Sequence, residues 1–354
     1  MHKFKPSTRL EKSITGDDII WRRWYIIFCT LRVIIAVFGT GYIHPDEYFQ
    51  SIEVWAGRRE CSTDEENYCG GLAWEFQPEN GLRSVLPSRL MSLPLPFLKF
   101  PLLSEFVSNR TFLVVLSFAI DWFVVCRGKA SYRFLTLWAS SWPLLVFAIR
   151  PFSNSLELFV LAGLVHAMSR VSGCCGDGGG GKKGRANVWA AIVTGMSGAL
   201  GIFTRFTFVF FAIPYVVMPV GKTILAAIPA DSTKSTKQKQ QNVVSLCSIF
   251  VMTVAFAAFS GLFIAVDSAY YGRLTIAPLN NFMYNIKTEN VAQHGLHPRW
   301  THLAANFPIL FGSLLMLVLS RGKRISEEST TRVDWLRILF PLFALSLSPH
   351  QEIR

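Results

Sequence analysis

Long runs of apolar residues, separated by short polar and basic stretches, recur along almost the whole chain. A helix needs roughly 20 apolar residues to cross the hydrocarbon core of a bilayer. By this criterion the pattern predicts an all-α polytopic membrane protein with about nine transmembrane helices. We predict them at 24–42, 111–126, 134–149, 152–168, 188–204, 206–221, 243–266, 302–320 and 335–349.

A further apolar stretch, 84–107, contains Pro87, Pro94, Pro96 and Pro101. Proline removes a backbone donor and interrupts a helix. We therefore expect short helices at the membrane surface here and leave this stretch out of the count. If it crossed the membrane, every later loop would change sides.

Composition and charge agree with a membrane protein. Apolar residues make up 51% of the chain and charged residues 16%, whereas soluble domains carry about 25% charged residues. The net charge of +12 is compatible with nucleic-acid binding. However, more than half of the 35 Lys and Arg lie in segments that the predicted helices place on one side of the membrane. The positive-inside rule makes this side cytoplasmic, and we expect no nucleic-acid partner. The segments are 1–23, 127–133, 169–187, 222–242 and 321–334.

The predicted topology divides the chain into a cytoplasmic tail, 1–23, and one multi-span domain, 24–354. The first apolar run keeps Arg32 and lacks a cleavage site of small residues, so it is typical of an uncleaved signal anchor. On the non-cytoplasmic side lie a long first loop, 43–110, and a second loop, 267–301. Cys61 and Cys69 in the first loop are either a disulfide or two free thiols.

An acidic cluster follows the first predicted helix. Pro45 at a first helical position, with Asp46 and Glu47 in the first turn, predicts a helix start. Asp46 then shares one face with Gln50 and Glu53 at helical spacing. Carboxylates so close to a bilayer are costly and often functional. They are equally compatible with a simple interaction with the helix dipole.

Further polar clusters fall on the same side of the predicted membrane. Glu75 and Arg83, close to Trp74, supply a carboxylate and a guanidinium that can hold a sugar or a phosphate. Arg205 interrupts the apolar stretch 188–221 at a turn. The tail carries His350, Glu352 and Arg354.

Arg150, Asn154 and Glu157 open the predicted helix 152–168, where Asn154 and Glu157 share a face. A hydrogen-bonding pair between helices is an equally good interpretation. Asp121 lies deeper in its predicted helix, and we expect it to act in packing. His294 and His297 lack a carboxylate at metal-binding spacing, so we predict no metal site.

Several of these clusters, in this order, resemble the polytopic mannosyltransferases that use dolichyl-phosphate mannose, which share the class C glycosyltransferase fold. The resemblance covers nearly all of 42–354. It rests on 44–47 (HPDE), 74–76 (WEF), 83–84 (RS), 150–157 (RPFSNSLE), 204–207 (TRFT), 281–285 (NFMYN) and 350–354 (HQEIR). In the family the last segment is followed by more membrane helices, so the resemblance implies a chain that is truncated at its C-terminus.

The resemblance implies a reaction and a place. Mannose would pass from dolichyl-phosphate mannose to the third mannose of the GPI glycolipid precursor, in an α-1,2 linkage and with inversion. The site would face the lumen of the endoplasmic reticulum, with 43–110 and 267–301 as the lumenal loops. Alternatives within the family are the addition of the third mannose and the mannosylation of an N-glycan precursor.

The resemblance also implies roles for site residues. Asp46 would be the catalytic base, with Glu47 as the second choice or as a residue that orients the acceptor. Arg205, Arg83 or Arg354 would balance the charge of the leaving phosphate. No cofactor is implied beyond the lipid-linked donor. The residues expected to bind substrate are His44, Glu75, Arg83, Arg150, Asn154, Glu157, Arg205, His350, Glu352 and Arg354.

A lipid or solute transporter is the rival class, because polar residues within membrane helices also line transport pathways. Transporters often show internal repeats and broken central helices. The sequence shows no convincing repeat, and its polar clusters lie on one side rather than at mid-membrane. An enzyme is therefore favoured over a transporter or a scaffold.

Overall fold

A computed structural model describes residues 16–39, 41–54, 72–92, 105–128, 132–173, 182–227, 236–287 and 289–290. These residues form helices and loops, without a strand. The helix Leu246–Tyr271 is long and apolar enough to cross a membrane, and Val188–Thr204 and Phe208–Gly221 are shorter apolar helices. The all-α prediction is confirmed for this part of the chain. The count of nine spans stays a prediction, and the spans predicted at 302–320 and 335–349 lie outside the described residues.

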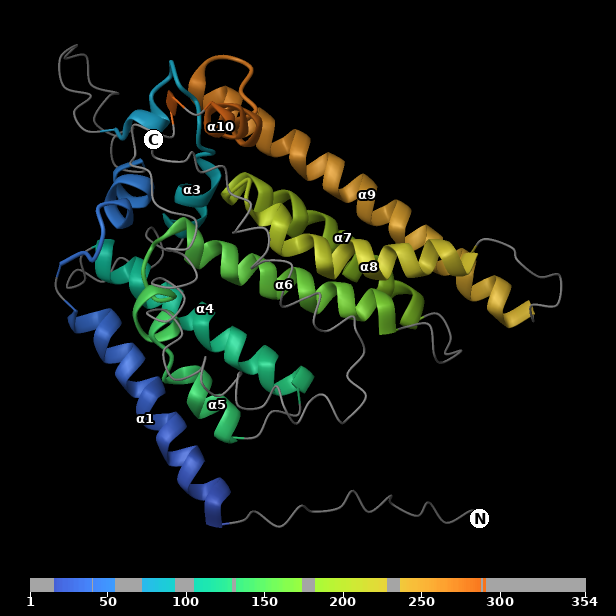
Figure 1. The fold of residues 1–354 in the computed structure, drawn as a ribbon, viewed down its shortest axis with the longest axis horizontal. Coiled ribbons are helices and arrows are strands. Elements are labelled where there is room, and N and C mark those ends of the chain that lie inside the picture. The colour runs from blue at the N-terminus through green and yellow to red at the C-terminus, as the bar shows by residue number, and fades with distance from the viewer. Residues whose placement is uncertain are drawn as a thin grey trace, which may run out of the picture.

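The longer helices form a bundle (Figure 1). Helix α7 packs between α6 and α9, while α1 packs against α4 and α5. Apolar runs produce these helices, and small residues allow their close approach: a Cβ on Gly195 of α7 would collide with the backbone of Met252 in α9. The bounds are α1 (Gly16–Phe38), α4 (Glu105–Gly128), α5 (Tyr132–Ala139), α6 (Ser153–Gly173), α7 (Lys182–Thr204), α8 (Phe208–Ala227) and α9 (Thr236–Tyr271).

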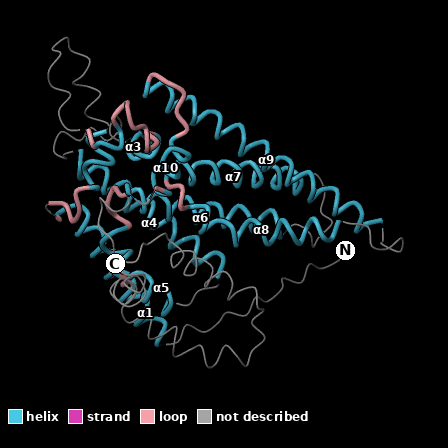
Figure 2. Tube along the Cα trace, turned by 45° about the horizontal axis from the view of Figure 1, so that its top comes forward, coloured by secondary structure: helices cyan, strands magenta, loops and turns pink. Residues whose placement is uncertain are grey.

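Short elements gather at one end of the bundle (Figures 1 and 2). Residues 46–54 are helical, as Pro45 predicted, and include the π-helical turn η1 (Tyr48–Ile52). The others are η2 (Trp74–Phe76), α3 (Leu86–Ser92) and α10 (Ala277–Ile286). Helix α3 confirms a short helix within the proline-rich stretch, whose residues 93–104 are not described. This end of the bundle carries most of the polar clusters singled out from the sequence.

The prediction of one helix over 134–149 is wrong. The chain there forms α5, a turn, and the π-helical η3 (Pro143–Phe147). Pro143 has no backbone donor, and the hydroxyls of Ser140 and Ser141 donate to the carbonyls of Leu137 and Trp138. The apolar pattern continues through this break, because backbone chemistry and not hydrophobicity ends the helix.

Two other boundaries differ from the prediction. Helix α1 begins at Gly16, inside the predicted tail 1–23, and ends at Phe38. Helix α9 extends to Tyr271, so Asp267 lies on a helix and not in the predicted loop 267–301. The loop itself contains α10.

A buried ion pair joins α1 to α4. Arg32 Nη1 lies 3.0 Å from Asp121 Oδ2, and neither side chain is more than 2% exposed. Tyr25 and Trp138 also donate to this carboxylate, each at 3.0 Å. A buried charge is tolerated where it is paired and hydrogen-bonded. Asp121 therefore links three helices, in agreement with its predicted role in packing.

Candidate active site

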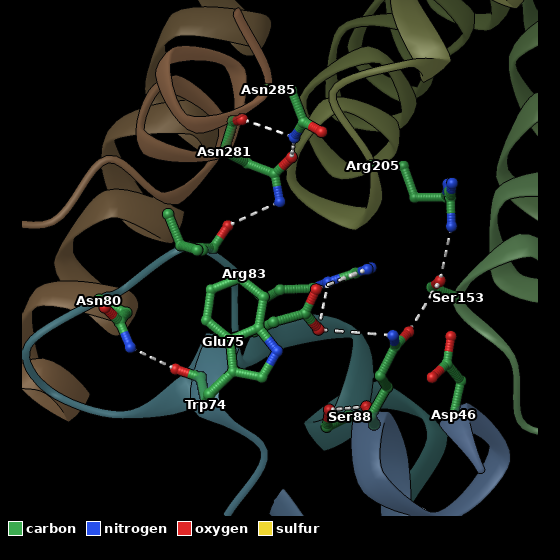
Figure 3. A network of polar contacts seen from close by, with 12 residues as sticks. Asp46, Trp74, Glu75, Asn80, Arg83, Ser88, Ser153, Arg205, Asn281 and Asn285 are labelled. Atoms are coloured by element: carbon green, nitrogen blue, oxygen red, sulfur yellow. Dashed lines mark hydrogen bonds and ion pairs between the residues drawn. The ribbon is translucent and has the colours of Figure 1, made fainter. Parts of the chain in front are cut away.

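Four segments distant in sequence meet at the end of the bundle and form one polar network (Figure 3). They are the helical residues 46–54, the loop 74–84, the start of α6, and the turn between α7 and α8. Gln50 and Ser153 connect the parts: Gln50 Nε2 donates to Glu75 Oε2, and Ser153 Oγ donates to Gln50 Oε1, both at 3.5 Å. The sequence had placed Gln50 on the face of Asp46, whereas Ser153 was noted only as part of a motif.

Glu75 and Arg83 form a two-pronged ion pair within the loop. Arg83 Nε and Nη2 donate to the two oxygens of Glu75 at 3.0 and 3.1 Å. The side chains are 18–20% exposed. Such paired hydrogen bonds fix the plane of the guanidinium as well as its position. The structure thus brings together two of the predicted substrate-binding residues.

Arg205 lies in the turn between α7 and α8 and points toward the start of α6. It donates to Asn154 Oδ1 at 2.5 Å and to Ser153 Oγ at 3.3 Å, and its Nε is 3.5 Å from Glu157 Oε2. Burial lowers the pKa of Arg205, while the Glu157 carboxylate acts in the opposite direction. Arginine remains a cation under such conditions. Its side chain is 31% exposed, so a ligand can reach it.

The Asp46 side chain is more accessible than those of Glu47, Glu75 and Glu157. It is 46% exposed, and its Oδ1 lies 3.5 Å from His44 Nδ1, which accepts a hydrogen bond from the Asp46 backbone N–H. Figure 3 shows it beside Ser153, on the side of the network where Arg205 lies. Its negative charge acts on Arg205 and partly opposes the lowering of the pKa that burial causes there. Asp46 is therefore accessible and close to a cation.

Glu47 has a different environment from its neighbour. It has no exposed surface, and it pairs with Arg110 at 2.6 Å and with Arg150 at 2.8 Å. Arg110 also donates to the carbonyls of Gly39 and Gly41 after α1. This geometry favours a role for Glu47 and Arg150 in holding the loop to α4 and α6, over the predicted roles in catalysis and substrate binding. Sequence reasoning missed Arg110, which it placed at the end of the predicted loop 43–110 and not in a helix.

A cavity of about 50 Å³ lies beside the network. Segments 82–84, 202–207 and 277–281 line it, and they contribute both Arg83 and Arg205. Thr207 and Asn281, which carry a hydroxyl and an amide group, also line the cavity. Two guanidinium groups with neutral donors suit an anionic group such as a phosphate.

Residues 23–354 match the sequence profile of the Alg9-like mannosyltransferase family. The chain belongs to this family. The resemblance identified from the sequence is thereby confirmed at the level of the family. No solved structure matches the chain.

Curated relatives of this Alg9-like chain carry the name GPI mannosyltransferase 4. The protein from Schizosaccharomyces pombe is 30% identical over 94% of this chain and 59% of its own length. That from Aspergillus oryzae is 30% identical over 95% of this chain and 61% of its own. That from Saccharomyces cerevisiae is 26% identical over 94% and 61%. The chain thus spans about three fifths of the length of these relatives.

Other predicted site residues are exposed or not described. His44 has a side chain that is 61% exposed and contacts Asp46, whereas His350, Glu352 and Arg354 lie outside the described residues, as do His294, His297, Cys61 and Cys69. Within the described ranges no group of three or more His, Cys, Asp or Glu residues is placed to hold a metal ion. That the reaction needs no metal stays a prediction.

Proposed function

We propose that this member of the Alg9-like mannosyltransferase family transfers mannose from dolichyl-phosphate mannose to the third mannose of the GPI glycolipid precursor. The linkage is α-1,2 and the anomeric carbon is inverted. The enzyme lies in the membrane of the endoplasmic reticulum, with its site toward the lumen. Support comes from the family and from relatives named GPI mannosyltransferase 4.

One observation carries the proposal: an accessible carboxylate and two guanidinium groups meet beside a cavity at the end of a helical bundle. Asp46, Arg83 and Arg205 come from three segments that are far apart in sequence. A scaffold protein has no need of this convergence. A glycosyl transfer from a lipid phosphate needs both a base for the acceptor and cations for the leaving group.

Asp46 is the base in the proposed reaction. The donor is β-linked and the product α-linked, so one displacement with inversion suffices and no covalent intermediate forms. The acceptor hydroxyl attacks the anomeric carbon, the bond from that carbon to the phosphate oxygen breaks, and Asp46 takes the hydroxyl proton. The exposure of Asp46 fits this role better than the environment of Glu47, which is buried and paired with two arginines.

Arg205 balances the charge that develops on dolichyl phosphate as it leaves. Arg83 donates through Nε and Nη2 to the two oxygens of Glu75, at 3.0 and 3.1 Å. Arg205 has a longer ion pair, at 3.5 Å, with Glu157, and its Nη1 donates to the neutral groups of Asn154 and Ser153. A guanidinium with a weaker internal partner is better able to engage phosphate oxygens in the transition state. Arg83 then holds the phosphate in the ground state, and no metal or other cofactor takes part.

The test is an assay of membranes that contain the chain, with labelled dolichyl-phosphate mannose and GPI precursors bearing two or three mannoses. The matched pair of variants is Asp46→Asn and Glu79→Gln, because Glu79 is also an exposed carboxylate. We expect transfer to the three-mannose acceptor, its loss in Asp46→Asn and its retention in Glu79→Gln.

Two other results would change the assignment. Transfer only to the two-mannose acceptor would make the chain a third-mannose transferase. Transfer to neither acceptor would overturn the GPI assignment, and N-glycan precursors and lipid transport would be tested next.

A further inference from the structure

The loop segment that carries Arg83 is tied to α9 and α10 through three successive carbonyl groups. Asn280 Nδ2 donates to Gly81 O at 3.0 Å, and Asn281 Nδ2 donates to Leu82 O at 3.2 Å. Tyr271 Oη donates to Arg83 O at 2.6 Å. All three side chains come from segments 188 to 199 residues further along the chain.

Asp267 holds the next two residues of the same segment. Its Oδ1 accepts from the hydroxyl of Ser84 at 2.9 Å and from the backbone N–H of Val85 at 3.0 Å. Asp267 has no exposed surface, and it lies one helical turn before Tyr271 at the end of α9. A buried carboxylate at the end of a membrane helix is costly, and such residues usually have a specific role.

Gly81 shows that the path of this segment is closely constrained. Its φ is +53°, in the left-handed region that favours glycine. A Cβ at this position would lie 3.2 Å from Thr275 Cγ2, in the loop before α10. Side chains of α9 and α10 thus hydrogen-bond to every residue of the segment 81–85. Little space remains between Gly81 and Thr275.

We propose that Asp267 and Tyr271 are positioning residues of the active site, which act on Arg83 through its main chain. They fix residues 83–85, and the Arg83 side chain is then directed to Glu75 and to the cavity that it shares with Arg205. Neither residue lines that cavity. The identity of the ligand that Arg83 binds rests on the proposed function. The position of the Arg83 main chain rests on the hydrogen bonds alone.

Asp267→Asn and Asp267→Leu separate positioning from mere stability. Asparagine keeps an oxygen that accepts from Ser84 and Val85, whereas leucine keeps the size and leaves both donors without a partner. Tyr271→Phe removes only the hydroxyl that binds Arg83 O. Asp121→Asn is the matched control, because Asp121 is also a buried helix carboxylate but binds Tyr25, Arg32 and Trp138 instead.

Hydrogen exchange of the full chain in detergent is the first readout. Amides of 82–86 should exchange at least about tenfold faster in Asp267→Leu and Tyr271→Phe than in the wild type, because local opening controls exchange. They should be unchanged in Asp267→Asn and Asp121→Asn. Unchanged exchange in both Asp267→Leu and Tyr271→Phe would overturn the placement, whether or not the chain transfers mannose.

Kinetics of mannose transfer are the second readout. Asp267→Leu should raise the apparent KM for dolichyl-phosphate mannose about tenfold and change kcat less, since ground-state binding of the phosphate is weakened. Combined with Arg83→Gln, it should add little further loss, because both changes remove one interaction. Fully additive losses, or equal losses in Asp267→Asn and Asp267→Leu, would overturn the action through Arg83. Absence of transfer in the wild type would instead refute the proposed function and leave the exchange result to decide the placement.

Discussion

Glu47 and Arg110 form an ion pair of 2.6 Å in which neither side chain has any exposed surface. Arg150 completes the cluster at 2.8 Å from the second oxygen of Glu47. Residue 46, the immediate neighbour, is 46% exposed. Adjacent carboxylates in one helical turn therefore have opposite environments. Substitution of Glu47 should lower stability, whereas substitution of Asp46 should lower activity at unchanged stability.

Glu47→Ala should lower the thermal stability of the protein in detergent. Removal of one partner from a buried ion pair costs about 3–5 kcal/mol, because it leaves the remaining charge unpaired. Both Arg110 and Arg150 would lose the Glu47 carboxylate. A thermal unfolding experiment that followed the loss of folded protein would show a lower Tm and a parallel loss of transfer. An unchanged Tm with lost transfer would assign Glu47 a catalytic role instead.

Asp46→Asn should abolish most of the transfer and leave the Tm unchanged. A general base contributes roughly 10²–10⁴-fold to the rate, and asparagine cannot accept the proton. The exposed side chain makes no buried ion pair, so its loss costs little stability. Initial rates with saturating donor, measured beside the Tm, check both parts. A rate within threefold of the wild type would exclude Asp46 as the base.

Arg205→Gln and Arg83→Gln should differ in kinetic signature. Arg205→Gln should reduce kcat about 10²-fold or more, as the loss of a donor to a developing negative charge does. Arg83→Gln should mainly raise the KM for the donor, because a ground-state contact is lost. Rates over a range of dolichyl-phosphate mannose concentrations distinguish the two. The reverse pattern would exchange the roles of the two arginines.

The environments of Asp46 and Glu47 show where sequence reasoning reaches its limit. The pattern predicted a helix start after Pro45 and placed both carboxylates in its first turn, and the structure confirms a helix there. It could not tell which carboxylate is accessible, since burial of Glu47 depends on Arg110 and Arg150, which are 63 and 103 residues away in the chain.

The same limit applies to the rest of the site. Hydropathy predicted most of the described helices, because apolar runs are local, but it missed the break at Pro143 and the extension of α9 to Tyr271. The predicted topology placed Glu75, Arg83, Asn154, Glu157 and Arg205 on one side of the membrane. Their actual partners, such as Ser153 for Arg205, follow only from the packing of α6 against α7 and α8.

Gly195→Ala should destabilise the protein, although alanine is the better helix former. The new Cβ would collide with the backbone of Met252 and would lie 2.8 Å from Phe256 N in α9. Backbone atoms cannot rotate away, so α7 and α9 must separate, at a cost of about 1–3 kcal/mol. The matched control is Gly261→Ala in α9, where a Cβ meets no atom within 4 Å.

At Gly261 a new Cβ causes no collision, so the higher helix propensity of alanine should stabilise the folded protein by up to about 1 kcal/mol. The Tm of the two variants should thus shift in opposite directions, which thermal unfolding in the same detergent measures directly. Equal shifts would show that α7 and α9 are not in close contact at Gly195. Because α7 leads directly to Arg205 and α9 leads to Asp267 and Tyr271, the separation in Gly195→Ala should also weaken transfer, and Gly261→Ala should leave it unchanged.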